Sequence, residues 1–101
     1  MKAIINKKLY DTETASLVAR YNNGYALGDF NYIREELYRK KNGEYFIYGQ
    51  GGAWTKYSES DGDWMSGGSR IIPLTLEKAE KWAEMHMSAD DYLKFFKIVE
   101  D

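Results

Sequence analysis

The strongest local signal in the chain is Lys41-Asn42-Gly43-Glu44, which predicts a tight β-hairpin. Asparagine and glycine suit the two positive-φ positions of a type I′ turn. With a two-residue Asn42-Gly43 loop, Lys41 faces Glu44 as a favourable cross-strand pair. The next predicted pairs are Lys40 with Tyr45, Arg39 with Phe46, Tyr38 with Ile47 and Leu37 with Tyr48. A central antiparallel hairpin therefore constrains what can be built around it.

Short apolar runs bounded by turn residues predict further strands. Residues 2–10 indicate one short strand or a tight pair of strands, with a break at residues 6–8. Residues 53–57 are a candidate short strand. Residues 70–74 indicate a last strand, which Pro73 places at a sheet edge or near a strand end because proline donates no ladder hydrogen bond.

Three stretches predict helices. The first is expected from about Thr12 to Tyr21, with Asp11 as its N-cap, and the second begins after the N-cap Thr75. The third is expected over about residues 89–99, after Ser88. The sequence therefore predicts a single α+β domain over residues 1–101. Its order is β-α-β-β-β-α-α, a small antiparallel sheet of three or four strands packed with three helices.

The residues present exclude several kinds of site. The chain has no cysteine, so it can form no disulfide, thiolate zinc site or cysteine nucleophile. His86 is the only histidine, and a catalytic triad or a histidine metal site needs partners beyond it. We therefore expect no catalytic residue, no metal and no cofactor. The N-terminal stretch lacks the apolar run of a signal peptide, and no run is long enough to span a membrane. We expect a cytoplasmic protein.

Two motifs suggest chemistry but lack what it requires. The run Gly49-Gln50-Gly51-Gly52 is not followed by the Lys-Ser/Thr pair and helix of a phosphate loop. We expect instead that these glycines turn the chain sharply or let another backbone approach closely. The adjacent acids Glu35 and Glu36 lie in a predicted strand, so their side chains should point to opposite faces.

Residues 54–65 are the best candidate for a binding surface. Glycines and acids surround Trp64 in an expected exposed loop over residues 58–69, and tryptophan and tyrosine are typical anchors of binding hot spots. For Trp54 we favour a return onto the core, with exposure as the alternative.

Charge is distributed unevenly along the chain. Residues 1–58 carry nine lysines and arginines against six acids, whereas residues 59–101 carry five against ten. We favour solvated helix faces as the reason; the alternative is a surface that meets a basic partner. On that alternative the partner-binding set is Trp54, Tyr57, Glu59, Asp61, Asp63, Trp64, Glu77, Glu80 and Glu84.

Several segments together resemble a group of small proteins of bacterial phages and mobile elements. The likeness covers nearly the whole chain, and the group carries glutamate where this chain has Gln50. The segments are Tyr10 to Ala15, Asp29-Phe30, Glu36 to Lys40, Asn42 to Phe46, Tyr48 to Gly52, Ile72 to Thr75, Ala79 and Trp82 to Glu84.

Small proteins of this origin include the anti-CRISPR inhibitors. The resemblance implies an inhibitor that binds a CRISPR-Cas effector in the bacterial cytoplasm and masks a nucleic-acid-binding surface. The residues leave two alternatives open. One is a self-associating accessory protein, so the chain could be a monomer or a homodimer. The other is direct nucleic-acid binding by a basic aromatic sheet face. Its residues would be Lys7, Lys8, Arg34, Arg39, Lys40 and Lys41.

Overall fold

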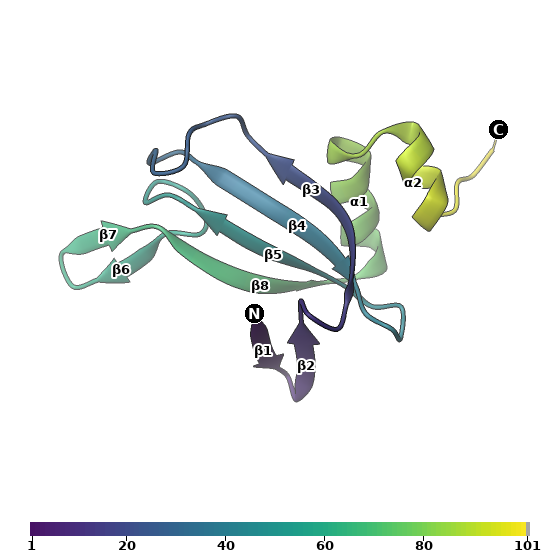
Figure 1. Cartoon of the computed structure of the whole chain (residues 1–101), viewed down its shortest axis with the longest axis horizontal. Coiled ribbons are helices and arrows are strands. Elements are labelled where there is room, and N and C mark those ends of the chain that lie inside the picture. Colours follow the sequence, from purple (N-terminus) through teal and green to yellow (C-terminus); the bar gives the residue numbers. More distant parts are fainter. Residues whose placement is uncertain (101) are drawn as a thin grey trace.

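The computed structural model describes residues 1–100 and has an α+β fold, with a four-stranded antiparallel sheet and two helices (Figure 1). The strands are β1 (Lys2–Ile5), β2 (Lys8–Asp11), β3 (Ser16–Asn22), β4 (Ile33–Arg39), β5 (Tyr45–Gly51), β6 (Glu59–Asp61), β7 (Trp64–Ser66) and β8 (Gly68–Leu74). The helices are α1 (Leu76–His86) and α2 (Ala89–Phe95). The main sheet has the order β3-β4-β5-β8, and β1-β2 and β6-β7 are separate two-stranded hairpins.

The two faces of the main sheet support two cores. On the helix side, Leu37 and Ile47 pair across β4 and β5 and pack with Ala79 and Ala83 of α1. On the other side, Phe46 and Ile71 pack with Tyr10 of the N-terminal hairpin. The strict alternation of a strand sends neighbouring residues to these two cores. Figure 1 shows the helices and the β6-β7 hairpin at opposite ends of the sheet.

The central hairpin forms as predicted, but its register differs by one residue. Tyr38 faces Phe46 and Leu37 faces Ile47, because the loop has three residues, 41–43, and not two. Within this loop Gly43 alone takes a positive φ, +91°, which is the geometry of a type I turn followed by a bulge. The observed register puts Leu37 and Ile47 on the same face, where the helices cover both.

Residues 16–22 form an edge strand, so the predicted first helix is wrong. The Asp11 carboxylate does cap a turn, accepting from the Glu13 N–H at 2.9 Å, but the turn is not continued. Six of the seven residues of β3 then pair with β4, with a bulge at Val18 between Leu17 and Ala19. A short apolar run fits both the helix repeat of 3.6 residues and the strand repeat of two residues. Here the free edge of β4 supplies hydrogen-bond partners along its length, so the strand forms.

Of three smaller predictions, two are confirmed and one is wrong. Residues 2–10 form the tight pair of strands, through a turn in which Asn6 and Lys7 both have positive φ. Pro73 lies in the edge strand β8, as predicted. Residues 53–57 form turns and no strand, with the Thr55 N–H bonded to the Gly52 carbonyl.

The two predicted C-terminal helices form behind their expected caps. The Thr75 side chain accepts from the Lys78 N–H, and the Ser88 side chain accepts from the Asp91 N–H. Helix α2 ends at Phe95, earlier than predicted, because Phe96 turns into the core and stacks on Tyr45 with ring centroids 5.2 Å apart. Among residues 1–100, no helix is long and apolar enough to cross a membrane.

Replacement of a side chain at the centre of the helix-side core tests this packing. Leu37→Ala is expected to lower the free energy of unfolding by about 2–5 kcal/mol, because the fully buried site loses contacts on both β5 and α1. Urea denaturation measures the change. The matched control Leu27→Ala, at an exposed loop position, should change it by less than about 0.5 kcal/mol. Equal losses would contradict the described core.

Candidate functional site

A buried carboxylate links the sheet, a loop and a helix. Glu35 on β4 points to the helix side and is 4% exposed, whereas Glu36 points to the other face and pairs with Arg20, as the strand alternation predicts. The Glu35 carboxylate accepts from the Tyr57 hydroxyl and from the Trp82 indole N–H at 3.0 Å. The Lys56 ammonium lies 2.8 Å from it.

The protonation states in this cluster are fixed at neutral pH. Burial alone would raise the pKa of Glu35, but the hydrogen bonds from Lys56, Tyr57 and Trp82 and the Lys56 charge together hold it below its usual value. Burial, and then the hydrogen bond to Glu35, raise the pKa of Tyr57. Glu35 is therefore an anion and Tyr57 a neutral donor. This arrangement positions the loop that follows β5.

His86 does not join this network by a hydrogen bond. Its ring stacks on Tyr21 with centroids 3.8 Å apart and meets Trp82 edge-on at 4.9 Å. Burial is the main cause that lowers the pKa of His86, so the imidazole is neutral near neutral pH. It packs α1 against the edge strand β3, in line with a structural role. No group of three or more metal-ligating side chains lies together within residues 1–100.

The glycine run allows close approach, which was one of the two roles expected for it. The Tyr57 ring lies against Gly49, where a β-carbon would collide with the phenol. A β-carbon on Gly52 would collide with the backbone of Asp29. Residues 52–54 are thereby held against residues 29–32, with the Trp54 N–H bonded to the Phe30 carbonyl at 2.9 Å.

Exposed apolar side chains gather at the end of the molecule away from the helices. Trp54 is 70% exposed, so its expected return onto the core is wrong; its ring packs against the Phe30 ring, with centroids 4.9 Å apart. Trp64 is 79% exposed, as expected. We call Leu27, Phe30, Trp54, Trp64 and Met65 the aromatic end. A hollow of about 410 Å³ lies among its loops.

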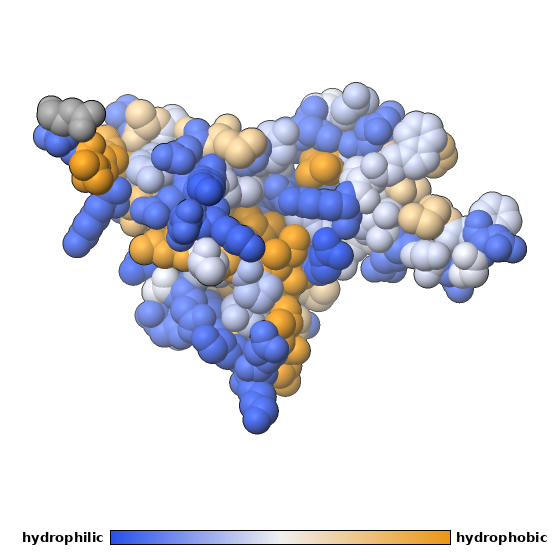
Figure 2. Space-filling model, turned by 180° about the vertical axis from the view of Figure 1, so that it is seen from behind, coloured by the Kyte–Doolittle hydropathy of each residue, from blue (hydrophilic) through white to orange (hydrophobic). Residues whose placement is uncertain are grey.

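The β6-β7 hairpin carries part of the aromatic end on a projecting arm. Residues 59–66 were expected as an irregular loop but pair as two short strands, with Gly62 at a positive φ of +64° in the turn. Figure 2 shows the arm extending from the body of the molecule at the right. Asp61 faces Trp64 across the hairpin. Within residues 1–100, the exposed acids Glu59, Asp61 and Asp63 have no ion-pair partner.

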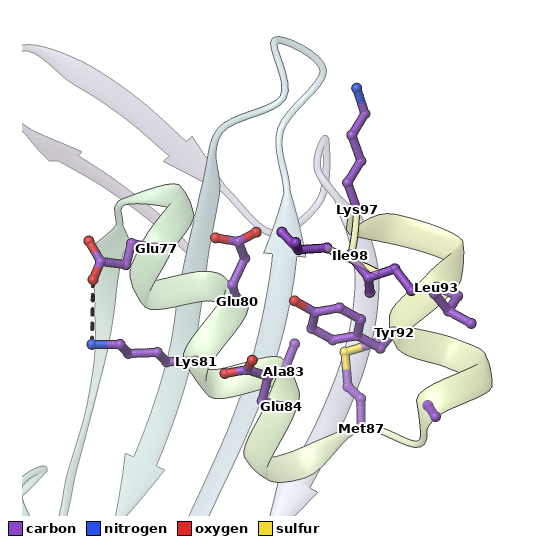
Figure 3. A pocket seen from close by; sticks show the side chains of 12 residues that line it. Glu77, Glu80, Lys81, Ala83, Glu84, Met87, Tyr92, Leu93, Lys97 and Ile98 are labelled. Carbon is purple, nitrogen blue, oxygen red and sulfur yellow. Dashed lines mark ion pairs between the residues drawn. The ribbon is translucent and has the colours of Figure 1, made fainter. Parts of the chain in front are cut away.

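The structure divides the partner-binding set predicted from sequence. Trp54, Trp64 and the three acids of the arm lie at the aromatic end, but Tyr57 is only 2% exposed and cannot serve as an anchor. Glu77, Glu80 and Glu84 lie on α1 and line a groove between the helices (Figure 3). The two acidic groups are thus at opposite ends of a molecule 51 Å long (Figure 1).

The basic residues do not form one sheet face. Arg34 and Arg39 are five positions apart on β4, so they project to opposite faces. Lys8 pairs with Glu44 at 3.2 Å, and the Lys40 ammonium lies 4.3 Å from the centre of the Tyr10 ring. Lys8, Lys40 and Lys41 line a shallow hollow, with the exposed Lys7 beside them in the β1-β2 turn.

Comparisons with known proteins give no relative: no family model matches the chain, and neither the curated proteins nor the solved structures contain a match.

Sequence reasoning missed Glu35 as a linking residue and missed Leu27 and Phe30 as exposed anchors. The alternation of β4 contained a signal for the first, since Glu35 shares a face with Leu37. An acid on an apolar face requires donors, and these come from residues 21, 22 and 47 positions away in the sequence.

The pH dependence of stability tests the Glu35 cluster. Glu35→Gln is expected to lower the free energy of unfolding at neutral pH by about 1–3 kcal/mol, because Lys56 loses its anion. The folded pKa lies below the ordinary value of 4.5, so the carboxylate stabilises the fold fully above that value. This contribution is lost as pH falls through the folded pKa.

Urea denaturation from neutral to acid pH measures the effect. The wild-type protein should approach Glu35→Gln in stability below about pH 4.5. Glu13→Gln, which changes an exposed acid, should follow the wild-type profile. A constant difference between wild type and Glu35→Gln at every pH would contradict the stated charge of the cluster.

Proposed function

We propose that this chain is a stoichiometric binding protein whose aromatic end contacts a protein partner. The observation that supports this most is the exposure of five large apolar side chains at one end of so small a domain. Such patches on monomeric proteins usually mark interaction sites. Tryptophan is also the residue most enriched among binding hot spots, and Trp54 and Trp64 are both more than two-thirds exposed.

The loop that carries Trp54 is held in place before binding, which favours tight binding. Loop 52–58 is fixed at one side by the Tyr57 hydrogen bond to Glu35 and at the other by the Trp54 hydrogen bond to Phe30. A side chain that is already held in place loses less conformational entropy on association. A preformed surface with apolar anchors is what a stoichiometric inhibitor requires, and no catalytic step is needed for it to act.

Charge favours a basic surface on the partner. Glu59, Asp61 and Asp63 surround the exposed Trp64, and Asp29 lies beside Phe30. Acids around apolar anchors steer a protein toward positively charged patches and away from nucleic acid itself. A protein surface that normally holds nucleic acid is such a patch.

The target that we propose is a CRISPR-Cas effector, with the arm masking its nucleic-acid-binding surface. The support for this step is the resemblance of the chain to small proteins of phages and mobile elements. Effectors hold guide RNA and target DNA in positively charged channels, so an acidic arm with an aromatic tip is chemically matched to them. Inhibition then follows from occupancy at a one-to-one ratio.

Trp64→Ala tests the proposal. It should weaken binding to the effector by at least about 30-fold and abolish protection of a plasmid from interference, because the central anchor of the arm is lost. Leu9→Ala, an exposed apolar residue outside the aromatic end, is the control and should inhibit like wild type. Circular dichroism melts verify that both variants stay folded.

Two results would contradict the proposal. One is full interference in the presence of wild-type protein across a panel of effector types. The other is inhibition that Trp64→Ala leaves intact. A salt-dependent shift of single-stranded or duplex nucleic acid by the free protein would instead favour direct binding by Lys7, Lys8, Lys40 and Lys41.

A further inference from the structure

The second surface of interest is the groove between α1 and α2. Its volume is about 790 Å³, and the chain closes it on a third side with residues 97–99. The floor is apolar: Ala83 and Met87 come from α1 and its C-cap, and Leu93 and Ile98 lie across from them (Figure 3). Leu93 and Ile98 are each about half exposed, so the groove is open and leaves apolar surface uncovered.

The rim of the groove is negative. Glu77 is paired with Lys81 at 3.5 Å, but Glu80 and Glu84 have no ion-pair partner within residues 1–100. Lys97, the other cation of the lining, extends away from these carboxylates in Figure 3. Two uncompensated carboxylates therefore stand beside an apolar floor.

Tyr92 reports the same local field. Its hydroxyl points toward the side of the groove that carries Glu80 and Glu84 (Figure 3). Partial burial and then the negative charges of Glu80 and Glu84 raise the pKa of Tyr92. A cation placed between these three groups would reduce the repulsion between the Glu80 and Glu84 carboxylates. It could also donate a hydrogen bond to the neutral Tyr92 hydroxyl.

The walls of the groove are preformed. Helix α1 is capped by Thr75 at its start, and the Met87 N–H bonds to the Ala83 carbonyl at its end. The Tyr92 ring packs at a tilt against Phe96 with centroids 5.0 Å apart, and Phe96 stacks on the buried Tyr45. The groove therefore belongs to the same packed unit as the helix-side core, which lowers the entropy cost of ordering it on binding.

We propose that the α1-α2 groove binds a cationic amphipathic helix of a partner protein. A helix of that kind presents apolar side chains to the floor and lysine or arginine to Glu80 and Glu84, as in other helix-in-groove complexes. The carboxylates repel nucleic acid and anionic lipid, which excludes those ligands by charge. The groove is distinct from the aromatic end, at the other end of the long axis (Figure 1). On this proposal one chain could bind two partner proteins at once, one at the aromatic end and one in the groove.

A model peptide tests the groove without knowledge of the partner. The probe is a fluorescein-labelled synthetic helix with leucine on one face and lysine on the other, and fluorescence anisotropy measures its binding to the full chain. The wild-type protein should bind this lysine peptide. It should bind a control peptide, in which glutamate replaces every lysine, far more weakly. Affinity should fall as salt rises from about 0.1 M to about 1 M, because salt screens the attraction between the peptide and the partly or fully exposed rim carboxylates.

Matched variants separate the groove from the rest of the surface. Glu80→Gln and Glu84→Gln should each weaken binding about twofold to fivefold, as exposed charge pairs do, whereas Glu13→Gln should not. Ile98→Ser should weaken it about fivefold or more, whereas Leu9→Ser, at an equally exposed position, should leave it unchanged. Trp64→Ala should also leave it unchanged, so failure here and failure of the aromatic end are distinguishable.

Three results would overturn the proposal. One is the absence of peptide binding to a folded wild-type protein. Another is equal binding by wild type, Glu84→Gln and Ile98→Ser. The third is a stable dimer in light scattering that Ile98→Ser converts to monomer, because a second copy of the chain would then cover the groove.

Discussion

The buried anion of Glu35 is the interaction on which the arrangement of this small protein depends. A buried carboxylate is costly unless donors surround it, and here the donors come from three separate positions. Trp82 brings α1 onto the sheet, and Lys56 and Tyr57 bring the loop that follows β5. The side chain at position 49 has to be absent for the Tyr57 ring to fit. One charge thus fixes both the helix and the loop from which the arm projects.

The two surfaces that we propose bind partners lie at the two ends of the molecule (Figure 1). At one end, residues 27–30, 54 and 64–65 present apolar side chains with acids around them. At the other end, α1 and α2 enclose an apolar groove with two unpaired carboxylates. The titratable groups near the middle have partners: Glu35 is charged, Tyr57 is a neutral donor to it, and His86 stacks on Tyr21 and meets Trp82 edge-on. Both proposed binding surfaces lie outside this central cluster.

The sequence predicted correctly those elements that turn and cap residues determine. The central hairpin, the caps Thr75 and Ser88 and the edge position of Pro73 are confirmed, because turn and cap chemistry involves only neighbouring residues. The hairpin register was wrong by one residue, since a two-residue and a three-residue loop share the same sequence signal. Residues 16–22 became a strand because β4 offered a partner from a distance. Trp54 packs against Phe30 and not against the core, and this contact between segments distant in the sequence is not indicated by any local signal.

Photo-crosslinking in cells tests the central claim, that the aromatic end contacts a protein partner, most directly. A photoreactive amino acid would replace Trp64 in one protein and Leu9 in another, each expressed in bacteria with an active CRISPR effector chosen from the interference panel as the one for which inhibition is measured. The account predicts a discrete adduct with an effector subunit from position 64 and none from position 9. Adducts from position 9 alone, or from neither position while inhibition persists, would contradict it.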